Sequence, residues 1–254
     1  MRPADWLPVL FDLADRADAI SMRYFLSEDL NTTAKPDRSV VTKADLEVET
    51  AIRDAVVASH PSVGVFGEEH GEVKGDGATR LIVDPIDATA NFARGIPIFA
   101  TLLGLETDGE IVASVVSAPA LQRRWHAARG EGAWCGDRRL RVSSVAKLED
   151  AQIFHTSLAG GEAVPNTEKV IPLLRKSWRQ RGLGDFYQHM LLAEGCAELA
   201  LDPIVAPWDI AALQIIVEEA GGKATTFGGE RTIYAGSLLS SNGLLHDEAL
   251  AAFA

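Results

Sequence analysis

The sequence predicts a layered fold of mixed α-helices and β-strands, and three observations support this prediction. Residues 6–26 place apolar side chains at helical spacing, with acidic residues between them. Two apolar runs, 98–106 and 111–118, are separated by an Asp-Gly turn, as in a β-hairpin. Residues 209–220 form a second clear helical pattern, which two glycines end.

Another helix and several short strands are expected in the first half of the chain. Residues 42–45 have the pattern of a capping box, which opens this helix, and His60-Pro61 ends it. The other elements expected here are strands at 63–66, 80–84, 123–128 and around 133–134, and a glycine-rich polar loop at 71–78.

The chain changes character near residues 140–144. We therefore expect a single catalytic domain over residues 1–254, with two subdomains, about 1–140 and 141–254, that meet near residue 140. The elements expected in the second half are strands at 152–156 and 232–240, and helices at 167–178, from 188 to 193, at 209–220 and at 247–253.

The composition is that of an ordinary globular protein with an acidic balance. Of 254 residues, 47% are hydrophobic and 24% are charged, and 24 Lys and Arg stand against 36 Asp and Glu, a formal charge of −12. This balance argues against nucleic acid or an anionic membrane as the main partner. An acidic protein that binds phosphate must neutralise repulsion locally, which bound divalent metal ions would do.

Cysteine usage and hydropathy indicate a cytoplasmic protein. Cys135 and Cys196 have no metal-binding spacing, and we expect two free thiols. The acidic N-terminal segment lacks the apolar core of a signal peptide, and no apolar run reaches the ~18 residues of a membrane span.

The strongest motif places two aspartates at the end of a predicted strand. The apolar run 81–83 leads into Asp84, and Asp87 follows with Pro85 between them. Because proline fixes the backbone, the two carboxylates can converge, and such oxygen ligands suit magnesium. The carbonyl oxygen of Ile86 is a further candidate ligand. Alternatively, Asp84 ends the strand in a turn and Asp87 caps the following helix.

Two more acidic residues are candidate ligands. Glu68 follows a short apolar strand and could also orient the attacking water; its alternative is a solvated acidic turn. Asp209 would arrive from a distant part of the chain; its alternative is a capping residue in the first helical turn. After Asp87, the N–H groups of Ala88 and Thr89 would face a phosphate from the first turn of a helix.

Three short motifs stand out by their type, order and spacing. They are Gly67-Glu68-Glu69, then Asp84-Pro85-Ile86-Asp87 followed by Thr89 and Asn91-Phe92, and then Trp208-Asp209 before Gly221-Gly222. This combination resembles the inositol monophosphatase superfamily of lithium-sensitive, magnesium-dependent phosphatases. The resemblance also includes residues 41–45 and 130–136 and covers nearly the whole chain.

The resemblance implies a layered αβαβα fold, a homodimer, and two to three magnesium ions, with manganese as a possible substitute. The implied ligands are Glu68, Asp84 and the Ile86 carbonyl for one ion, Asp84, Asp87 and Asp209 for a second, and Glu68 for a third, more labile ion.

The resemblance also assigns roles in catalysis. Asp45, otherwise only the capping-box acid, and Thr89 are implied beside the nucleophilic water, with Glu68 as the base. The amides of Ala88 and Thr89 are implied to hold phosphate. The family has glycine at the position of Ala88, and alanine is tolerated there at little cost only if its φ is negative.

The stretch from Gly184 to Gly195 resembles the histidinol-phosphate phosphatase branch. L-Histidinol phosphate carries an amine and an imidazole, so its pocket should present acids, for which Asp185 and Asp202 are candidates. Their alternatives are a turn residue and the start of a loop. The three histidines near these motifs lack ligand spacing and are read as structural: His126, His155 and His189.

Other functions stay open at this point. The substrate could be inositol 1-phosphate, or 3′-phosphoadenosine 5′-phosphate with Arg179 and Arg181 near its second phosphate. A non-catalytic protein that contacts the transcription machinery is the alternative from another class.

Overall fold

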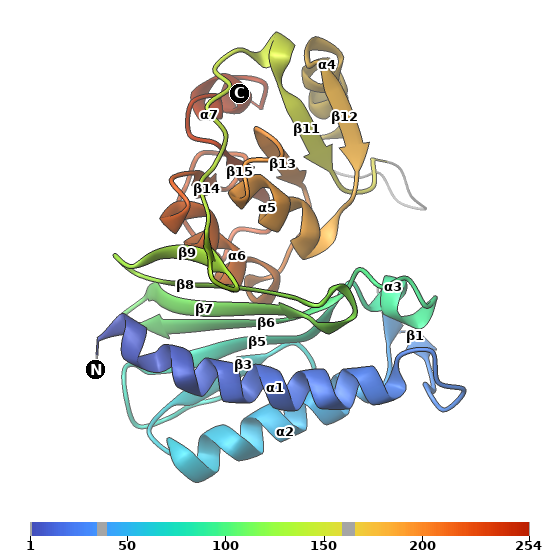
Figure 1. Ribbon diagram of the computed structural model, residues 1–254, viewed down its shortest axis with the longest axis vertical. Helices are drawn as coiled ribbons and strands as arrows, with labels where there is room; N and C mark the ends of the chain where they lie inside the picture. The colour runs from blue at the N-terminus through green and yellow to red at the C-terminus, as the bar shows by residue number, and fades with distance from the viewer. Residues whose placement is uncertain (1, 35–39, 159–165, 254) are drawn as a thin grey trace.

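The computed structural model describes residues 2–34, 40–158 and 166–253. Five layers follow one another in Figure 1: a layer of helices, an eight-stranded sheet, a second layer of helices, a five-stranded sheet, and an outer layer of helices. This arrangement confirms the α/β layered prediction. No helix among the described residues is long and apolar enough to cross a bilayer.

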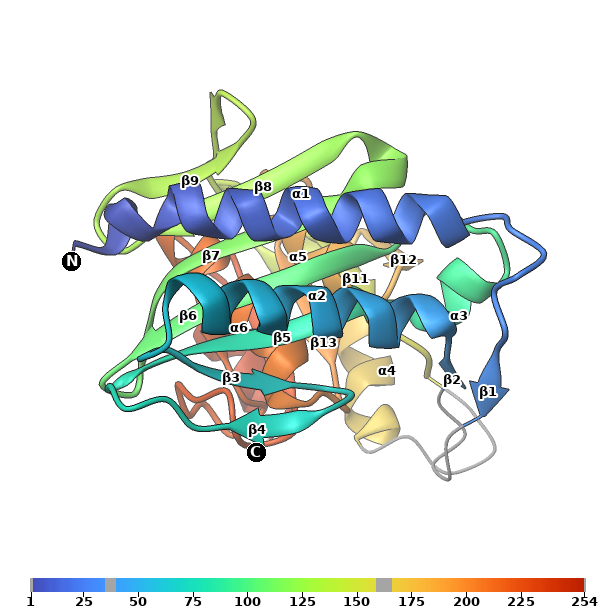
Figure 2. The same cartoon turned by 90° about the horizontal axis from the view of Figure 1, so that it is seen from below.

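The first layer consists of α1 (Leu7–Tyr24), which follows a short 3-10 turn at Pro3–Trp6, and α2 (Lys43–Ser59). Both helices cover one face of the large sheet (Figure 2). The predicted capping box is present at the start of α2, where Thr42 Oγ1 accepts from the Ala44 N–H and Asp45 Oδ2 accepts from the Thr42 N–H.

The large sheet is mainly antiparallel, with the strand order β10-β9-β8-β7-β6-β5-β3-β4. Only the pairing of β3 with β5 is parallel within it. The predicted hairpin is formed by β6 and β7. The strands are β3 (Gly64–Gly67), β4 (Gly71–Val73), β5 (Thr79–Asp87), β6 (Ala100–Thr107), β7 (Glu110–Ala118), β8 (Arg123–Ala128), β9 (Gly132–Cys135) and β10 (Arg138–Arg139).

The second half of the chain builds the remaining layers. Its sheet has the order β12-β11-β13-β15-β14. Its elements are β11 (Gln152–His155), α4 (Thr167–Lys176), β12 (Arg179–Gly182), α5 (Asp185–Ala193), β13 (Leu199–Asp202), α6 (Pro207–Glu219), β14 (Lys223–Thr225), β15 (Leu238–Ser241) and α7 (His246–Ala251). The smaller elements of the chain are β1 (Thr33–Ala34), β2 (Val40–Val41), α3 (Thr89–Ala93), and 3-10 turns at Pro119–Leu121 and Leu148–Asp150.

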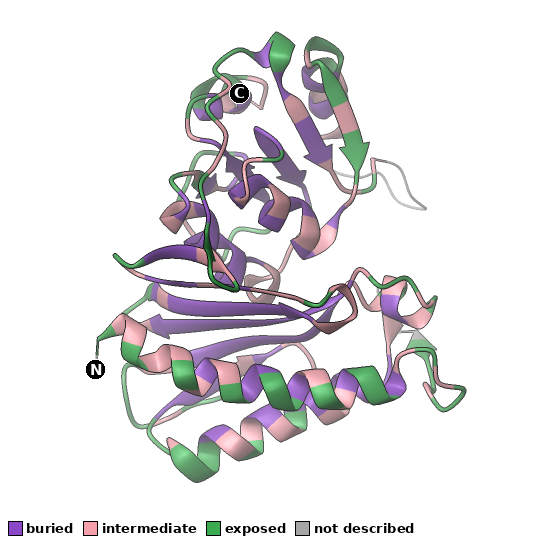
Figure 3. Ribbon diagram, viewed as in Figure 1, coloured by how far each residue is buried: buried purple, intermediate pink, exposed green. Residues whose placement is uncertain are grey.

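Helices α5 and α6 lie between the two sheets, and α6 packs against β6 and β7. The two elements are in close contact: a Cβ added at Gly104 of β6 would lie only 2.7 Å from the Ala211 Cβ of α6. Buried residues, purple in Figure 3, gather at these interfaces. One apolar core therefore joins residues of both halves, such as Leu102 and Ile215.

Several predicted elements of the chain were wrong in extent. Helix α5 begins at Asp185 rather than at 188, and the strand predicted for 232–240 is reduced to β15, because the chain bends at Gly236, where φ is +73°. Strands β12 and β13 were not predicted; β12 has a polar sequence and pairs on one side only. Part of the predicted 71–78 loop is strand β4. The subdomain boundary near residue 140 stays a prediction.

Candidate metal centre

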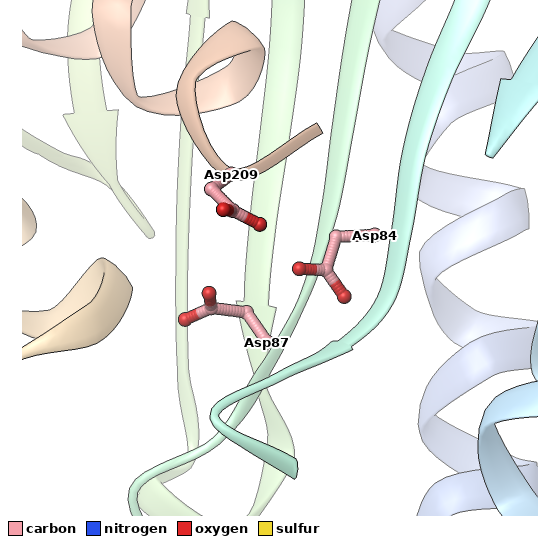
Figure 4. Close-up of side chains that lie close together, drawn as sticks. All are labelled: Asp84, Asp87 and Asp209. Atoms are coloured by element: carbon pink, nitrogen blue, oxygen red, sulfur yellow. The ribbon is translucent and has the colours of Figure 1, made fainter. Parts of the chain in front are cut away.

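Three carboxylates meet between the large sheet and α6. One oxygen from each of Asp84, Asp87 and Asp209 lies within 4.8 Å of the others (Figure 4). Asp84 and Asp87 come from the end of β5, and Asp209 comes from the first turn of α6. The structure thus brings together side chains that are more than 120 positions apart in the sequence.

The alternation of side chains along β5 explains why Asp84 faces α6. Leu81 and Val83 pack in the core with α1 and α2, whereas Ile82 packs in the core with α6. Asp84 is two residues beyond Ile82 and therefore lies on the same face. Asp87, three residues further, would lie on the opposite face of a regular strand.

A register shift turns Asp87 back toward Asp84. Asp84 pairs with Leu102 of β6, but Asp87 pairs with Ala100, so the three-residue step on β5 faces a two-residue step on β6. An irregularity of this kind redirects side chains and is common beside active sites. The sequence predicted the convergence of the two aspartates from Pro85 alone, without this irregularity.

Glu68 lies beside Asp84 because β3 and β5 run parallel. The last residue of β3, Gly67, pairs with Val83, and the Glu68 N–H donates to the Val83 carbonyl at 3.3 Å. Glu68 is outside the three-carboxylate cluster, but its charge contributes to the raised pKa values of Asp84 and Asp209.

The electrostatics of the cluster favour a bound cation. Burial, followed by the charge of Glu68, raises the pKa of Asp84 well above its usual range, and burial with the charge of Asp185 does the same for Asp87. Burial also raises the pKa of Asp209 to about 6. Within the described part of the chain, the buried Asp84 Oδ1 has no hydrogen-bond partner. A hard divalent cation would satisfy this oxygen and offset the repulsion, so the residues fit magnesium.

Two oxygens of the cluster accept hydrogen bonds from backbone N–H groups. Asp87 Oδ2 accepts from the Phe186 N–H of α5 at 2.8 Å, and Asp209 Oδ2 accepts from the Ala206 N–H at 2.7 Å. Asp209 is therefore a capping residue of α6 as well as a member of the cluster, so the two interpretations of this residue are compatible.

Asp45 and Thr89 meet at the side of this cluster. The Asp45 Oδ2 atom serves the capping box, and its Oδ1 atom lies 3.2 Å from the Thr89 hydroxyl. That hydroxyl is also 2.9 Å from the Ile86 carbonyl oxygen, and its single proton can be donated to either acceptor. Burial raises the pKa of Asp45 to about 6.

Ala88 has a left-handed backbone, with φ 66° and ψ 44°, immediately before the five-residue helix α3. Because this φ is positive, the condition under which alanine would be tolerated here at little cost is not met. A left-handed conformation costs an L-residue roughly 1–2 kcal/mol, a penalty that glycine avoids.

The two candidate substrate acids share a cavity with the metal cluster. A pocket of about 100 Å³ is lined by four aspartates and six other residues, among them His189 and Ile204; the aspartates are Asp87, Asp185, Asp202 and Asp209. Burial raises the pKa of Asp185 to about 6, and burial followed by the charge of Asp185 raises that of Asp202 well above its usual range.

Among the residues of this cavity that were not recognised as site residues from the sequence are Ile204 and His189, which was read as structural. His189 donates to or accepts from Ser240 Oγ at 2.8 Å through Nδ1, and burial lowers its pKa to about 3. Ile204 is 64% exposed beside the cavity. Neither has a sequence signal, because a lone histidine and an apolar residue after a proline are common everywhere.

Comparison with known proteins identifies the family. The model of the inositol monophosphatase family matches residues 3–254. The chain belongs to the inositol monophosphatase family. The resemblance seen in its motifs is thereby confirmed, and the family is one of phosphoric monoester hydrolases.

Relatives within this family narrow the comparison. The chain is 45% identical to a histidinol-phosphatase of Mycobacterium tuberculosis over 97% of this chain and 96% of the relative. It is 42% identical to a histidinol-phosphatase of Streptomyces coelicolor, with 94% and 92% covered. Among solved structures, an IMPase of Thermotoga maritima superposes with a TM-score of 0.88 at 31% identity, covering 98% of this chain and 96% of that one.

Proposed function

We propose that this phosphatase hydrolyses L-histidinol phosphate to L-histidinol and phosphate, with magnesium as its cofactor. The observation that carries the proposal is an acid-lined cavity, with Asp185 and Asp202 in its wall, that opens directly beside the carboxylate cluster. The two histidinol-phosphatase relatives support the same substrate.

The proposed metal ligands are the predicted ones. Glu68, Asp84 and the Ile86 carbonyl would hold one ion, Asp84, Asp87 and Asp209 a second, and Glu68 would help to hold a third. When bound, magnesium lowers the pKa of water and neutralises phosphate oxygens, and manganese is a possible substitute. The buried Asp84 Oδ1 atom, which has no hydrogen-bond partner within the described ranges, supports this assignment.

The chain's own groups position the reactants. In the proposal, Asp45 accepts a hydrogen bond from Thr89, so that the Thr89 hydroxyl is held beside the attacking water. Glu68 accepts the proton of that water as the general base. The amides of Ala88 and Thr89, at the start of α3, bind the phosphate oxygens.

Asp185 and Asp202 are proposed to bind the leaving group. Burial raises the pKa of both carboxyls above its usual value, and a cationic partner favours their ionised form. The amine and imidazole of histidinol can supply that cation through charge-assisted hydrogen bonds, whereas inositol offers only hydroxyls.

The test is phosphate release with magnesium from L-histidinol phosphate, inositol 1-phosphate and 3′-phosphoadenosine 5′-phosphate under identical conditions. We expect the highest kcat/KM with L-histidinol phosphate. A higher kcat/KM with inositol 1-phosphate would overturn the assignment of L-histidinol phosphate as the substrate. If no phosphate is released from any of the three compounds, with magnesium or with manganese, the result would favour the non-catalytic role in contact with the transcription machinery.

Inositol 1-phosphate is the second candidate because the structural relative from Thermotoga maritima is an IMPase. The nucleotide substrate has less support, since Arg179 and Arg181 lie on β12 and are not among the residues that line the cavity. A cytoplasmic location, predicted from cysteine usage and hydropathy, and a homodimer, implied by the family resemblance, complete the proposal.

A further inference from the structure

The turn that carries Glu68 is held by a buried carboxylate of α2. Glu49 is fully buried, and its Oε2 atom accepts from the Glu69 N–H at 2.7 Å. Its Oε1 atom accepts from the His70 N–H at 3.1 Å. Because these are the two residues directly after Glu68, Glu49 fixes the backbone of the turn on one side of Glu68.

Arg53, four residues after Glu49 on α2, also binds the segment that carries Glu68. Its Nε atom donates to Glu49 Oε1 at 2.8 Å, and its Nη2 atom donates to the Gly71 carbonyl. The arginine side chain is only 12% exposed. Three consecutive backbone positions, 69 to 71, are thus bound by two charged side chains of one helix.

The backbone before Glu68 also lies against Glu49. A Cβ added at Gly67 would lie only 2.2 Å from Glu49 Oε1, so this position accepts no side chain without displacing the carboxylate. Burying a carboxylate is costly unless it is paired and hydrogen-bonded, as Glu49 is. Glu68 therefore stands between Gly67, which lies against the Glu49 carboxylate, and Glu69, whose N–H that carboxylate accepts.

Helix α2 also carries Asp45, four residues before Glu49 and on the same face. Since Asp45 Oδ1 meets the Thr89 hydroxyl, one rigid helix contacts both the Glu68 turn and the segment after β5. Glu49 has no role among the predicted site residues, so those roles do not explain why a charged side chain is buried at this position.

We propose that Glu49 is a positioning residue, which fixes Glu68 relative to Asp84 and thereby sets the affinity of the site for magnesium. The inference rests on the proposed function, since it requires Glu68 and Asp84 to hold the metal. Hydrogen bonds that orient metal ligands typically change metal affinity or activity by roughly 10–100-fold.

The decisive variant is Glu49→Gln. Glutamine keeps the size of the side chain but offers one acceptor oxygen instead of two, so it cannot accept from Glu69, His70 and Arg53 together. We expect magnesium affinity, measured by calorimetry in the absence of substrate, to fall roughly 10–100-fold. Phosphatase activity lost at low magnesium should return when the magnesium concentration is raised. Because magnesium also stabilises the fold, the variant is first shown to be folded without magnesium by circular dichroism.

The matched control is Glu106→Gln, which alters another buried glutamate, on strand β6 of the large sheet. Glu106 pairs with Arg80 on β5, four residues before Asp84, and accepts from the Tyr234 hydroxyl at 2.7 Å. Its loss should lower stability without changing magnesium affinity. Equal affinities in Glu49→Gln, the control and the unmodified protein would overturn the inference.

A second variant keeps the test decisive if Glu49→Gln does not fold. Arg53→Lys preserves the charge beside Glu49 but loses the planar donor set that reaches Gly71. We expect a smaller loss of magnesium affinity in the same direction, and an unchanged affinity would again contradict the inference. If the unmodified protein binds no magnesium, the proposed function fails instead, so the two failures are distinguishable.

Discussion

At the scale of single residues, the site depends on charges that the protein does not neutralise by itself. Asp84, Asp87 and Asp209 approach one another in a buried place, and Asp84 Oδ1 finds no partner among the described residues. Buried groups of this kind are normally paired. This arrangement is explained if the three carboxylates serve to bind a cation, even though they do not stabilise the metal-free protein.

Replacing Asp209 with Asn tests this explanation. Turnover should fall by more than about 100-fold, because changes to groups that only orient ligands already cost up to that factor. The metal-free variant should unfold at higher temperature than the unmodified protein, since one of three repelling carboxylates is removed. Full activity, or a metal-free protein that is much less stable, would contradict the metal assignment.

Ala88→Gly should relieve the left-handed strain before α3. Removing a penalty of roughly 1–2 kcal/mol while adding chain entropy worth about 0.4–1 kcal/mol leaves a net stabilisation of about 0–1.6 kcal/mol. Urea unfolding measures this difference. We also expect a lower KM, because the methyl group belongs to one of the two residues whose amides are proposed to bind phosphate; a higher KM would argue against that placement.

Asp185→Ser should change which substrate is preferred. Its carboxylate lines the cavity and is proposed to meet a cationic leaving group, so kcat/KM for L-histidinol phosphate should fall more than that for inositol 1-phosphate. A loss of a charge-assisted hydrogen bond is worth about 1.5–3 kcal/mol, or roughly 10–150-fold. Equal losses with both substrates would remove Asp185 from the specificity determinants.

At the scale of elements, the sequence predicted those whose signals are local. Helix α2 has a capping box, and the β6–β7 hairpin has an Asp-Gly turn; both are present as expected. Strand β13 is a short apolar run that periodicity alone does not distinguish from helix. The register shift between Asp84 and Asp87 depends on pairing with β6, so no local pattern could reveal it.

The same distinction applies to the candidate site. The motifs named Glu68, Asp84, Asp87 and Asp209 because each follows a strand or opens a helix. Glu49 was not predicted to contribute, since its partners are backbone groups of a turn about 20 residues away. The sequence shows only a glutamate within an amphipathic helix, which is usually solvated.

Gly104→Ala tests the packing of α6 on the large sheet. A new Cβ would lie 2.7 Å from the Ala211 Cβ and 3.1 Å from backbone atoms of α6, so the helix must move. Overpacking of this kind costs typically 1–3 kcal/mol, and activity should fall as well because α6 carries Asp209. Thermal unfolding and phosphate release provide the two measurements.

The matched control for this change is Gly228→Ala. The nearest atom to its new Cβ, Thr226 Oγ1, would be 3.5 Å away, an ordinary contact. Stability and activity of this variant should stay near those of the unmodified protein. A Gly104→Ala protein that behaved like this control would show that α6 and β6 are less tightly packed than the distances indicate.

At the scale of the whole molecule, the candidate site joins four of the five layers. Asp45 belongs to α2, Asp84 and Asp87 to the large sheet, Asp209 to α6, and Asp202 to the second sheet. Asp87 Oδ2 also accepts from the backbone of α5. Binding of a cation should therefore stabilise the entire fold and not one segment of it.

Bound magnesium should raise the free energy of unfolding, by an amount that grows with the logarithm of the magnesium concentration. At a concentration 100 times the dissociation constant, one site adds about 2.7 kcal/mol. Denaturant unfolding in magnesium and in a chelator measures this difference. Asp209→Asn is the control, in which the dependence on magnesium should be much weaker; equal dependence would place the stabilising cation elsewhere.

The position of α6 between the sheets has a consequence for synthesis on the ribosome. The strands of the large sheet are complete at Arg139, yet the face that contains Leu102 and Val116 is covered by α6, which ends at Glu219. Roughly eighty residues must follow, which takes roughly 4–16 s at about 5–20 residues per second. During that interval the nascent chain exposes an apolar sheet face, and chaperones that bind such surfaces should associate with it until translation has passed α6.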